Sequence, residues 1–250
     1  MLNQHTIERL TTMKLIGMVE AFTDQLAQPD LDRLSFAERF GLIVDRQWTW
    51  KENNRMARYL KNARPKLNAC VEDIDYKSPR GLDQSVMMKL LSCDWVTRRQ
   101  NIIVTGPTGV GKTYLACALV NKVCREGYRS LYLRAPKLSQ QMALARGDGS
   151  YGKTLAKLAK AHVLVIDDLG LSPMNDQERR DLLEIVEERH SHASTIVASQ
   201  LPVDLWHEQI GDPTIADAIL DRLIHNAHKI TLKGGSLRKK YARLDLNDHL

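Results

Sequence analysis

Residues 101–113 read NIIVTGPTGVGKT, a short β-branched run followed directly by the pattern G-x-x-x-x-G-K-T. The run before Gly106 is typical of a buried strand, and the segment after the pattern, Tyr114–Cys124, is typical of a helix. Glycines at 106, 109 and 111 allow the backbone to turn successive N–H groups inward, toward an anion at the positive N-terminal end of that helix. The stretch therefore predicts a strand, a phosphate-binding loop and a helix, in that order.

This loop is predicted to bind a nucleoside triphosphate together with Mg²⁺. The Lys112 ammonium would reach the β- and γ-phosphates, and the Thr113 hydroxyl would be a magnesium ligand. A glycine-rich turn that matches the pattern by chance is the alternative, and the strand and helix on either side argue against it. The residues predicted to bind the nucleotide are Gly106, Pro107, Thr108, Gly109, Val110, Gly111, Lys112, Thr113 and Tyr114.

A second apolar run, VLVIDD at residues 163–168, ends in two adjacent carboxylates. Acidic side chains fit a strand buried on both faces where it ends, at the carboxyl edge at which α/β sheets bind their ligands. We expect Asp167 to hold Mg²⁺, directly or through water, and Asp168 to orient or deprotonate the attacking water. Helix capping by Asp168 is the alternative, and one residue could serve both roles.

The rest of the chain divides into a helical part and an alternating part. Residues 15–26 carry an apolar stripe at helical spacing, Ser35 and Glu38 form a capping-box pattern for a second helix, and Pro65 would end that helix. We expect a helical N-terminal domain over residues 1–66, a linker and lead-in over 67–95, and an α/β domain over 96–250. Five strands separated by helices predict a parallel sheet covered on both faces, with the strands at 101–105, 130–133, 163–167, 195–199 and 229–232.

The composition is that of a globular protein, with 43% hydrophobic and 26% charged residues. No apolar run approaches the roughly 20 residues that a membrane span needs, so we expect a cytoplasmic protein that does not bind membranes. Lys and Arg number 36 against 30 Asp and Glu, a formal charge of +6 that permits a polyanionic partner. Basic residues dominate positions 46–66, where Arg55, Arg58 and Lys61 are DNA-binding candidates; a solvated helix face is an equally good reading.

Together these motifs resemble the AAA+ ATPases of the DnaC/IstB branch. The resemblance continues through LGLSPMNDQERRDLLEIVEERH (169–190), the pair Ser199–Gln200 and ILDRL (219–223). Two further stretches, ARGDGSYGKTLAKL (145–158) and GGSLRKKY (234–241), are similar to IstB, the transposition helper of a bacterial insertion-sequence family. The resemblance covers nearly the whole chain. It implies an α/β fold, a P-loop AAA+ core with a five-stranded parallel sheet, preceded by a small all-helical N-terminal domain.

The resemblance also implies roles for residues outside the two motifs. Gln200 stands where these ATPases have a polar sensor of the γ-phosphate or of the attacking water, although many relatives have Asn there. Arg222 matches the arginine finger that reaches the ATP of a neighbouring subunit, and Arg238 lies near the position of a second sensor arginine. The implied catalytic set is Lys112, Asp168, Gln200 and Arg222, with ATP between the subunits of a ring or helical homo-oligomer.

A second basic stretch, between residues 134 and 160, falls where initiator-type AAA+ proteins insert a helical element that follows DNA. The resemblance favours phosphate contacts over a plain surface role for this stretch, with Arg134, Lys137, Arg146, Lys153 and Lys157 as the candidates. The residues form no base-reading pattern, so the preference for particular duplex sequences should be weak.

The family implies a transposition helper with a DNA-stimulated ATPase, which assembles on duplex DNA and delivers or remodels the target for the transposase of the same element. A DnaC-like replicative helicase loader is the alternative, because it shares the core and prefers single strands. A small-molecule kinase would need an acceptor pocket and an arginine lid, and the sequence gives no sign of either. The intact pair Asp167 and Asp168 argues against a DNA scaffold that does not hydrolyse ATP.

Overall fold

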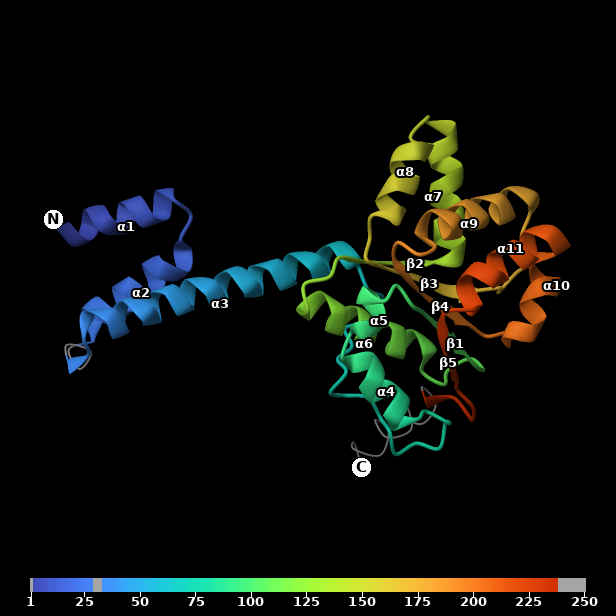
Figure 1. The fold of residues 1–250 in the computed structure, drawn as a ribbon, viewed down its shortest axis with the longest axis horizontal. Helices are drawn as coiled ribbons and strands as arrows, with labels where there is room; N and C mark the ends of the chain where they lie inside the picture. Colours follow the sequence, from blue (N-terminus) through green and yellow to red (C-terminus); the bar gives the residue numbers. More distant parts are fainter. Residues whose placement is uncertain (1, 29–32, 238–250) are drawn as a thin grey trace, which may run out of the picture. The chain divides into compact units, whose positions relative to one another are not determined.

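The computed structural model describes residues 2–28 and 33–237, and the chain divides into two compact units between Arg58 and Tyr59. Figure 1 traces the elements along the chain. Unit 1 is helical and unit 2 is α/β, as the sequence predicts. The division falls within α3 (Phe36–Ala63) rather than at residue 66, because Leu60 and Ala63 pack into the core of unit 2.

Unit 1 contains α1 (Leu2–Thr12), α2 (Ile16–Ala27) and most of α3. α2 packs closely on α3 at Gly17, where an added Cβ would approach the Gln47 Cα to 2.8 Å. The predicted capping box is present, since the Ser35 N–H donates to the Glu38 carboxylate at 2.8 Å and the Glu38 N–H donates to the Ser35 hydroxyl at 3.3 Å. Among the described residues of this unit, Gly17 and Ala21 alone are buried, so it has little core of its own.

Unit 2 is built on a five-stranded parallel sheet with the strand order β2-β3-β4-β1-β5. The strands are β1 (Asn101–Thr105), β2 (Ser130–Arg134), β3 (Val163–Leu169), β4 (Ser194–Ser199) and β5 (Ala227–Thr231). All five predicted strands are present, with small shifts at their ends. They could be found because strands buried on both faces read as continuous apolar runs.

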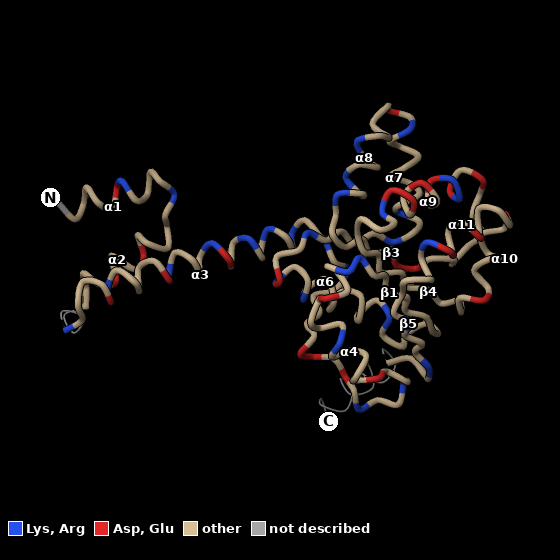
Figure 2. Tube along the Cα trace, in the orientation of Figure 1, with Lys and Arg blue, Asp and Glu red and all other residues tan. Residues whose placement is uncertain are grey.

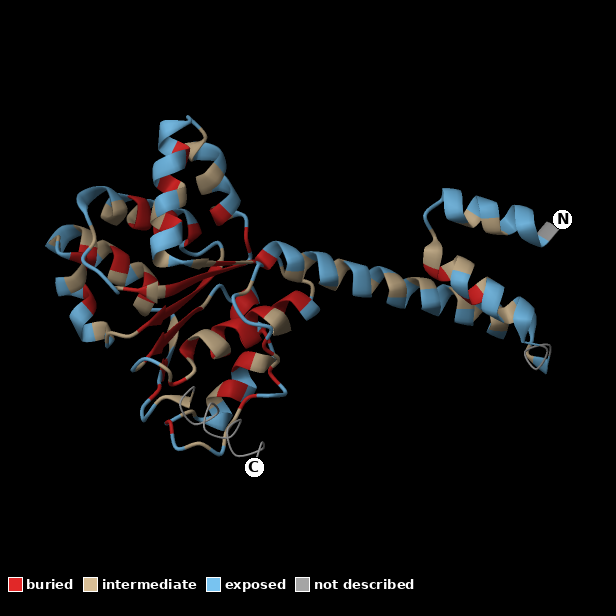
Figure 3. Cartoon of the chain, turned by 180° about the vertical axis from the view of Figure 1, so that it is seen from behind, coloured by how far each residue is buried: buried red, intermediate tan, exposed pale blue. Residues whose placement is uncertain are grey.

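Helices cover both faces of the sheet, and each face has its own apolar core, shown by the buried segments in Figure 3. One core contains α4 (Gln84–Leu91), α5 (Asp94–Thr97) and α6 (Lys112–Arg125). The other contains α7 (Ala135–Gly147), α8 (Tyr151–Ala159), α9 (Asp176–Arg189), α10 (Trp206–Ile210) and α11 (Pro213–Ile224), with the short 3-10 helix η2 (Val203–Leu205) before α10.

Residues 67–95, expected to form a linker and lead-in, pack on unit 2. Met87, Leu90 and Trp95 are at most 2% exposed, and the Trp95 indole N–H donates to the Leu90 carbonyl at 2.9 Å. Their apolar side chains complete the core on the α6 face, so the segment is part of the α/β unit. Within the part of the chain that the structure describes, no helix combines the length and the apolar character needed to cross a membrane.

Candidate active site

The predicted phosphate loop, residues 106–111, joins β1 to α6 at the carboxyl edge of the sheet. Its three glycines have positive φ angles, 144° at Gly106, 86° at Gly109 and 100° at Gly111, which side chains with a Cβ rarely tolerate. Gly111 is the N-cap of α6, and no side chain in the described residues caps this helix. The positive N-terminal end of α6 therefore faces the phosphate loop, where an anion would be stabilised.

Lys112 curls back over the loop that precedes it. Its ammonium donates to the carbonyl oxygens of Gly106 and Pro107, at 2.7 and 2.8 Å, and the residue is 7% exposed. Both of these acceptors are neutral carbonyls, so a phosphate oxygen would make a stronger, charge-assisted hydrogen bond with the same ammonium. The ammonium is therefore held at the loop, where it can exchange the two carbonyl oxygens for phosphate oxygens.

Asp167 is fully buried near the carboxyl end of β3, where its carboxylate accepts several hydrogen bonds. Its Oδ2 accepts from the Thr113 hydroxyl at 2.8 Å and from the Tyr132 hydroxyl at 2.5 Å, and its Oδ1 accepts from the Asp168 N–H at 2.9 Å. Burial, together with the hydrogen bond to this carboxylate, raises the pKa of Tyr132. The phenol therefore remains a donor to Asp167 at neutral pH.

The contact between the Thr113 hydroxyl and the Asp167 carboxylate fits Mg²⁺ chemistry. Mg²⁺ beside phosphates is held by one or two protein oxygens, and water or phosphate oxygens complete the octahedron. The described residues contain no group of three or more His, Cys, Asp or Glu side chains that could hold a metal ion. The Thr113 and Asp167 oxygens therefore suit a Mg²⁺ ion that binds together with a nucleotide. They do not suit an ion that is enclosed by protein ligands alone.

Asp168 has a φ of 61°, a left-handed conformation that is uncommon for residues with a side chain. Its carboxylate accepts a hydrogen bond from Arg134 Nε at 2.7 Å, and this bond raises the pKa of Arg134. Asp168 caps no helix, since Asn175 caps α9, the next helix along the chain. The structure therefore places Arg134, a predicted DNA-binding residue, next to the predicted catalytic acid.

The loop, Asp168 and Arg134 line a pocket of about 570 Å³. Gln200, which follows β4, also lines it, and its side-chain oxygen accepts from the Thr108 hydroxyl at 2.7 Å. Most of the predicted phosphate loop, Asp168 and the predicted sensor position thus line one cavity, and Asp167 adjoins it through Thr113. Part of its wall comes from the segment expected to be a linker, through Leu67, Asp73, Asp75 and Arg80, and Lys66 directly precedes that segment.

Arg80 is a candidate functional residue that sequence reasoning missed. It is 4% exposed, and its guanidinium donates to the Val110 carbonyl in the phosphate loop at 3.1 Å and to the Asp75 carbonyl at 2.9 Å. The side chain therefore ties the loop to the segment before β1 and places a positive charge beside Gly111. The surrounding SPRG reads as an ordinary turn, and no local signal distinguishes this arginine from a surface one.

Arg222, the implied arginine finger, lies in α11 and is not among the residues that line this pocket. It donates to Glu187 Oε1 at 2.7 Å and to the Ala218 carbonyl at 2.9 Å. A residue that acts on the nucleotide of a neighbouring subunit is expected to lie away from the pocket of its own chain. Arg238, the implied second sensor, lies outside the described residues.

The DNA-binding candidates on α3 are divided by the unit boundary. Arg55 and Arg58 belong to unit 1, and Lys61 belongs to unit 2. Arg55 forms an ion pair with Glu52 one turn earlier. Lys61 is exposed near the end of the helix.

The remaining DNA-binding candidates lie on α7 and α8. Lys137, Lys153 and Lys157 are exposed and form no ion pair with a described residue. Arg146 instead pairs with Asp181 of α9, and its guanidinium lies over the Tyr151 ring, 4.7 Å from the ring centroid. Of the five candidates in this region, the three lysines are therefore the ones whose charge is open to a polyanion.

Comparison with known proteins relates these features to a family. The model of the IstB-like ATP binding proteins matches residues 8–244. A Sinorhizobium fredii protein, named as an insertion sequence ATP-binding protein, is 48% identical over 243 residues, which cover 97% of this chain and 99% of that protein. A Pseudomonas aeruginosa protein with the corresponding name for insertion sequence IS21 is 32% identical over 237 residues, covering 95% of this chain and 88% of that protein.

Solved structures agree on the fold. The crystal structure of the DnaC helicase loader matches with a TM-score of 0.55 and 20% identity, covering 70% of this chain and 99% of that one. AMPPCP-bound DnaA from Aquifex aeolicus matches with a TM-score of 0.59 and 18% identity, covering 74% of this chain and 56% of that one. These likenesses, with the sheet and phosphate loop, show a P-loop AAA+ core. The chain belongs to the family of IstB-like ATP binding proteins.

Proposed function

We propose that this chain is an ATP-hydrolysing switch that assembles on duplex DNA and serves the transposase of its own insertion sequence. The observation that carries the proposal is a pocket lined by Lys112, Thr113 and Asp168 in a member of the IstB-like family. The buried Asp167 adjoins this pocket through its hydrogen bond from Thr113. The relatives named as insertion sequence ATP-binding proteins support the setting in transposition.

Each of these residues would have a separate role in ATP hydrolysis. The loop N–H groups and Lys112 bind the phosphates, which leaves the γ-phosphorus facing Asp168 and Gln200. Thr113 and Asp167 would hold Mg²⁺, which when bound neutralises charge on the phosphate oxygens. Asp168 then orients the attacking water or accepts its proton, which requires the carboxylate to part from Arg134.

The position of Arg222, outside the nucleotide pocket of its own chain, would make hydrolysis depend on assembly. Its ion pair with Glu187 lies at the surface, with side chains 26% and 58% exposed, and such pairs contribute about 0–1 kcal/mol. The arginine can therefore exchange this partner for the γ-phosphate of a neighbouring subunit at little cost. A finger of this kind contributes on the order of 10³–10⁵ in rate, so the complete site exists in the assembled state alone. ATP binding and assembly are then coupled.

Duplex DNA would bind through phosphate contacts, with Lys153 and Lys157 of α8 and Lys137 of α7 as the principal residues. Figure 2 shows the basic positions along α8, and none of these three lysines pairs with a described acid. Arg55 and Arg58 of unit 1 and, separately, Lys61 of unit 2 are further candidate contacts. Because the contacts are made to phosphates, the preference for target sequence would be weak and the affinity would depend strongly on salt.

Steady-state ATP hydrolysis tests the proposal, measured without DNA, with a duplex and with a single strand of the same sequence. We expect stimulation by the duplex, lost in Asp168→Asn and kept in Asp176→Asn, an exposed acid of α9 outside the pocket. Stimulation by the single strand alone would favour the helicase-loader alternative. Hydrolysis that is indifferent to any DNA, or that survives Asp168→Asn, would contradict the proposal.

A further inference from the structure

The outer edge of β2 is an unpaired strand edge in unit 2. β2 lies at one end of the strand order and pairs with β3 on its inner side. No backbone hydrogen bond joins its outer side to another described residue. A free edge exposes a row of N–H and C=O groups to which another strand can add, and proteins usually cover or charge such edges.

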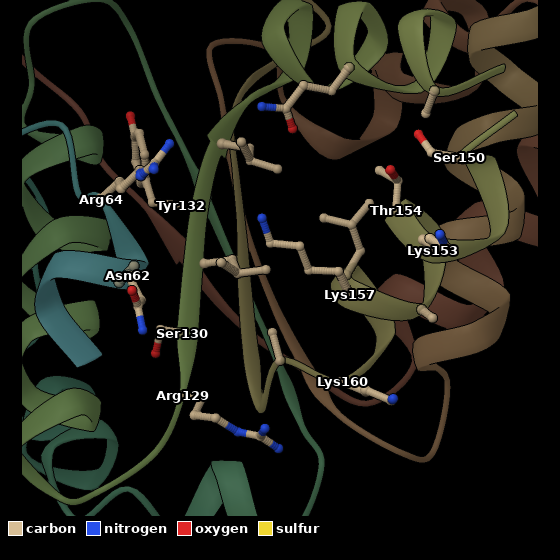
Figure 4. A pocket seen from close by; sticks show the side chains of 18 of the residues that line it. Asn62, Arg64, Arg129, Ser130, Tyr132, Ser150, Lys153, Thr154, Lys157 and Lys160 are labelled. Atoms are coloured by element: carbon tan, nitrogen blue, oxygen red, sulfur yellow. The ribbon is translucent and has the colours of Figure 1, made fainter. Parts of the chain in front are cut away.

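A large hollow lies along this edge. Its volume is about 920 Å³, and we call it the β2 groove; it is lined by residues 129–133, by the end of α3 and by residues of α7 and α8. Figure 4 shows β2 crossing the view, with Asn62 of α3 and Arg64, which follows α3, on one side and Lys157 of α8 on the other. The groove therefore opens where a sixth strand would continue the sheet, about 4.8 Å from β2.

The groove combines apolar and basic surface. Leu131 and Leu133 of β2 are incompletely buried there, and Leu144 of α7 is 64% exposed. Five basic side chains line it, none in an ion pair with a described residue: Arg64, Arg129, Lys153, Lys157 and Lys160. Asp148 is the one acid in the lining, and its carboxylate accepts from the N–H and hydroxyl of Ser150.

We propose that the β2 groove binds an extended acidic segment of a partner protein as a sixth strand of the sheet. The free strand edge, the apolar surface and the basic side chains of the groove each favour one property of this segment. The free edge selects an extended backbone, the leucines select apolar side chains on one face of the segment, and the unpaired cations select carboxylates. A segment that alternates apolar and acidic residues satisfies all three, because successive side chains of a strand point to opposite faces.

A nucleic acid satisfies one of these features and leaves the others unused. Its phosphates could pair with the basic side chains at the rim, as proposed for Lys153 and Lys157 on α8. Duplex phosphates and sugars cannot complete a β ladder, and they would not cover Leu131, Leu133 and Leu144. Arg129 and Lys160 both lie at one end of the groove in Figure 4 and are outside the proposed DNA contacts. Substitutions at these two residues therefore distinguish peptide binding from DNA binding.

The test uses the full chain and a fluorescent peptide of alternating leucine and aspartate, short enough to match the five residues of β2. A peptide of the same composition with leucines and aspartates in separate blocks, and an alternating leucine–lysine peptide, are the controls. We expect saturable binding of the first peptide alone. The double variant Arg129→Glu, Lys160→Glu should weaken this binding about tenfold, because each substitution replaces an attractive charge at the groove with a repulsive one.

Arg98→Glu is the matched variant, since Arg98 is an exposed cation outside the groove, and it should bind the peptide as the unaltered chain does. Hydrogen exchange should show new protection of the amides of residues 130–134 when the peptide is bound. Absence of saturable binding, equal binding by the double variant, or protection confined to other segments would overturn the proposal. Protection of the same amides by duplex DNA, with displacement of the peptide, would assign the groove to nucleic acid instead.

Discussion

Removal of the Tyr132 hydroxyl tests the hydrogen-bonded network that holds the predicted magnesium ligand. Tyr132→Phe deletes one oxygen from a side chain that is 7% exposed and leaves the ring in place. A hydrogen bond to a charged acceptor contributes about 1.5–3 kcal/mol. Asp167 keeps its hydrogen bonds from the Thr113 hydroxyl and the Asp168 N–H, so its carboxylate stays partnered. We therefore expect the free energy of unfolding of unit 2 to fall by about 1.5–2 kcal/mol, the lower part of that range.

Urea unfolding followed by tryptophan fluorescence measures this loss, since Trp95 and Trp206 are both buried in unit 2. Tyr128→Phe is the matched control, because the Tyr128 hydroxyl makes no hydrogen bond with a described residue, and we expect a change below about 0.5 kcal/mol. Combination of Tyr132→Phe with Thr113→Val should cost more than the sum of the two single changes, because Oδ2 of Asp167 then loses both donors. Equal losses in Tyr132→Phe and Tyr128→Phe, at an unchanged m-value, would refute the reasoning.

Four further changes address the nucleotide and DNA sites. Lys112→Ala should weaken ATP binding roughly 10- to 100-fold in calorimetry, because it removes a charge-assisted hydrogen bond, and unchanged affinity would contradict the assignment. Asp168→Asn should bind ATP normally but lower turnover on the order of 10²–10⁴-fold, whereas normal turnover would place water activation elsewhere. Arg222→Ala alone should be inactive. Mixed with Asp168→Asn, it should regain activity at interfaces where an intact Arg222 of one subunit meets an intact Asp168 of the next. No recovery in the mixture would argue against an arginine finger. Neutralisation of Lys153 and Lys157 together should reduce the salt slope of DNA binding by about one to two, and an unchanged slope would move DNA to other residues.

The sheet and the nucleotide pocket could be predicted because their signals are local. Each strand is a continuous apolar run, and the phosphate loop requires glycines in a fixed pattern between a strand and a helix. The parallel topology then brings the ends of β1, β3 and β4 to one edge, which is why Lys112, Asp167 and Gln200 line or adjoin the same pocket.

The other parts of the site depend on tertiary contacts that no local pattern contains. Arg134 belongs to a basic stretch of the sequence, yet the register that places it opposite Asp167 turns it toward Asp168. Arg80 stands in a turn-like tetrapeptide and is buried against the phosphate loop. The segment around Trp95 reads as a lead-in because it is short, and its burial follows from the α6 face that it covers.

Light scattering of the full chain, with a long duplex in ATP and in ADP, tests whether ATP drives assembly on DNA. Hydrolysis is followed in the same samples. We expect large assemblies that require both ATP and duplex, that persist in Asp168→Asn, and that disperse as wild-type chains convert ATP to ADP. A particle mass that stays the same in ATP and ADP, with or without duplex, would contradict this expectation.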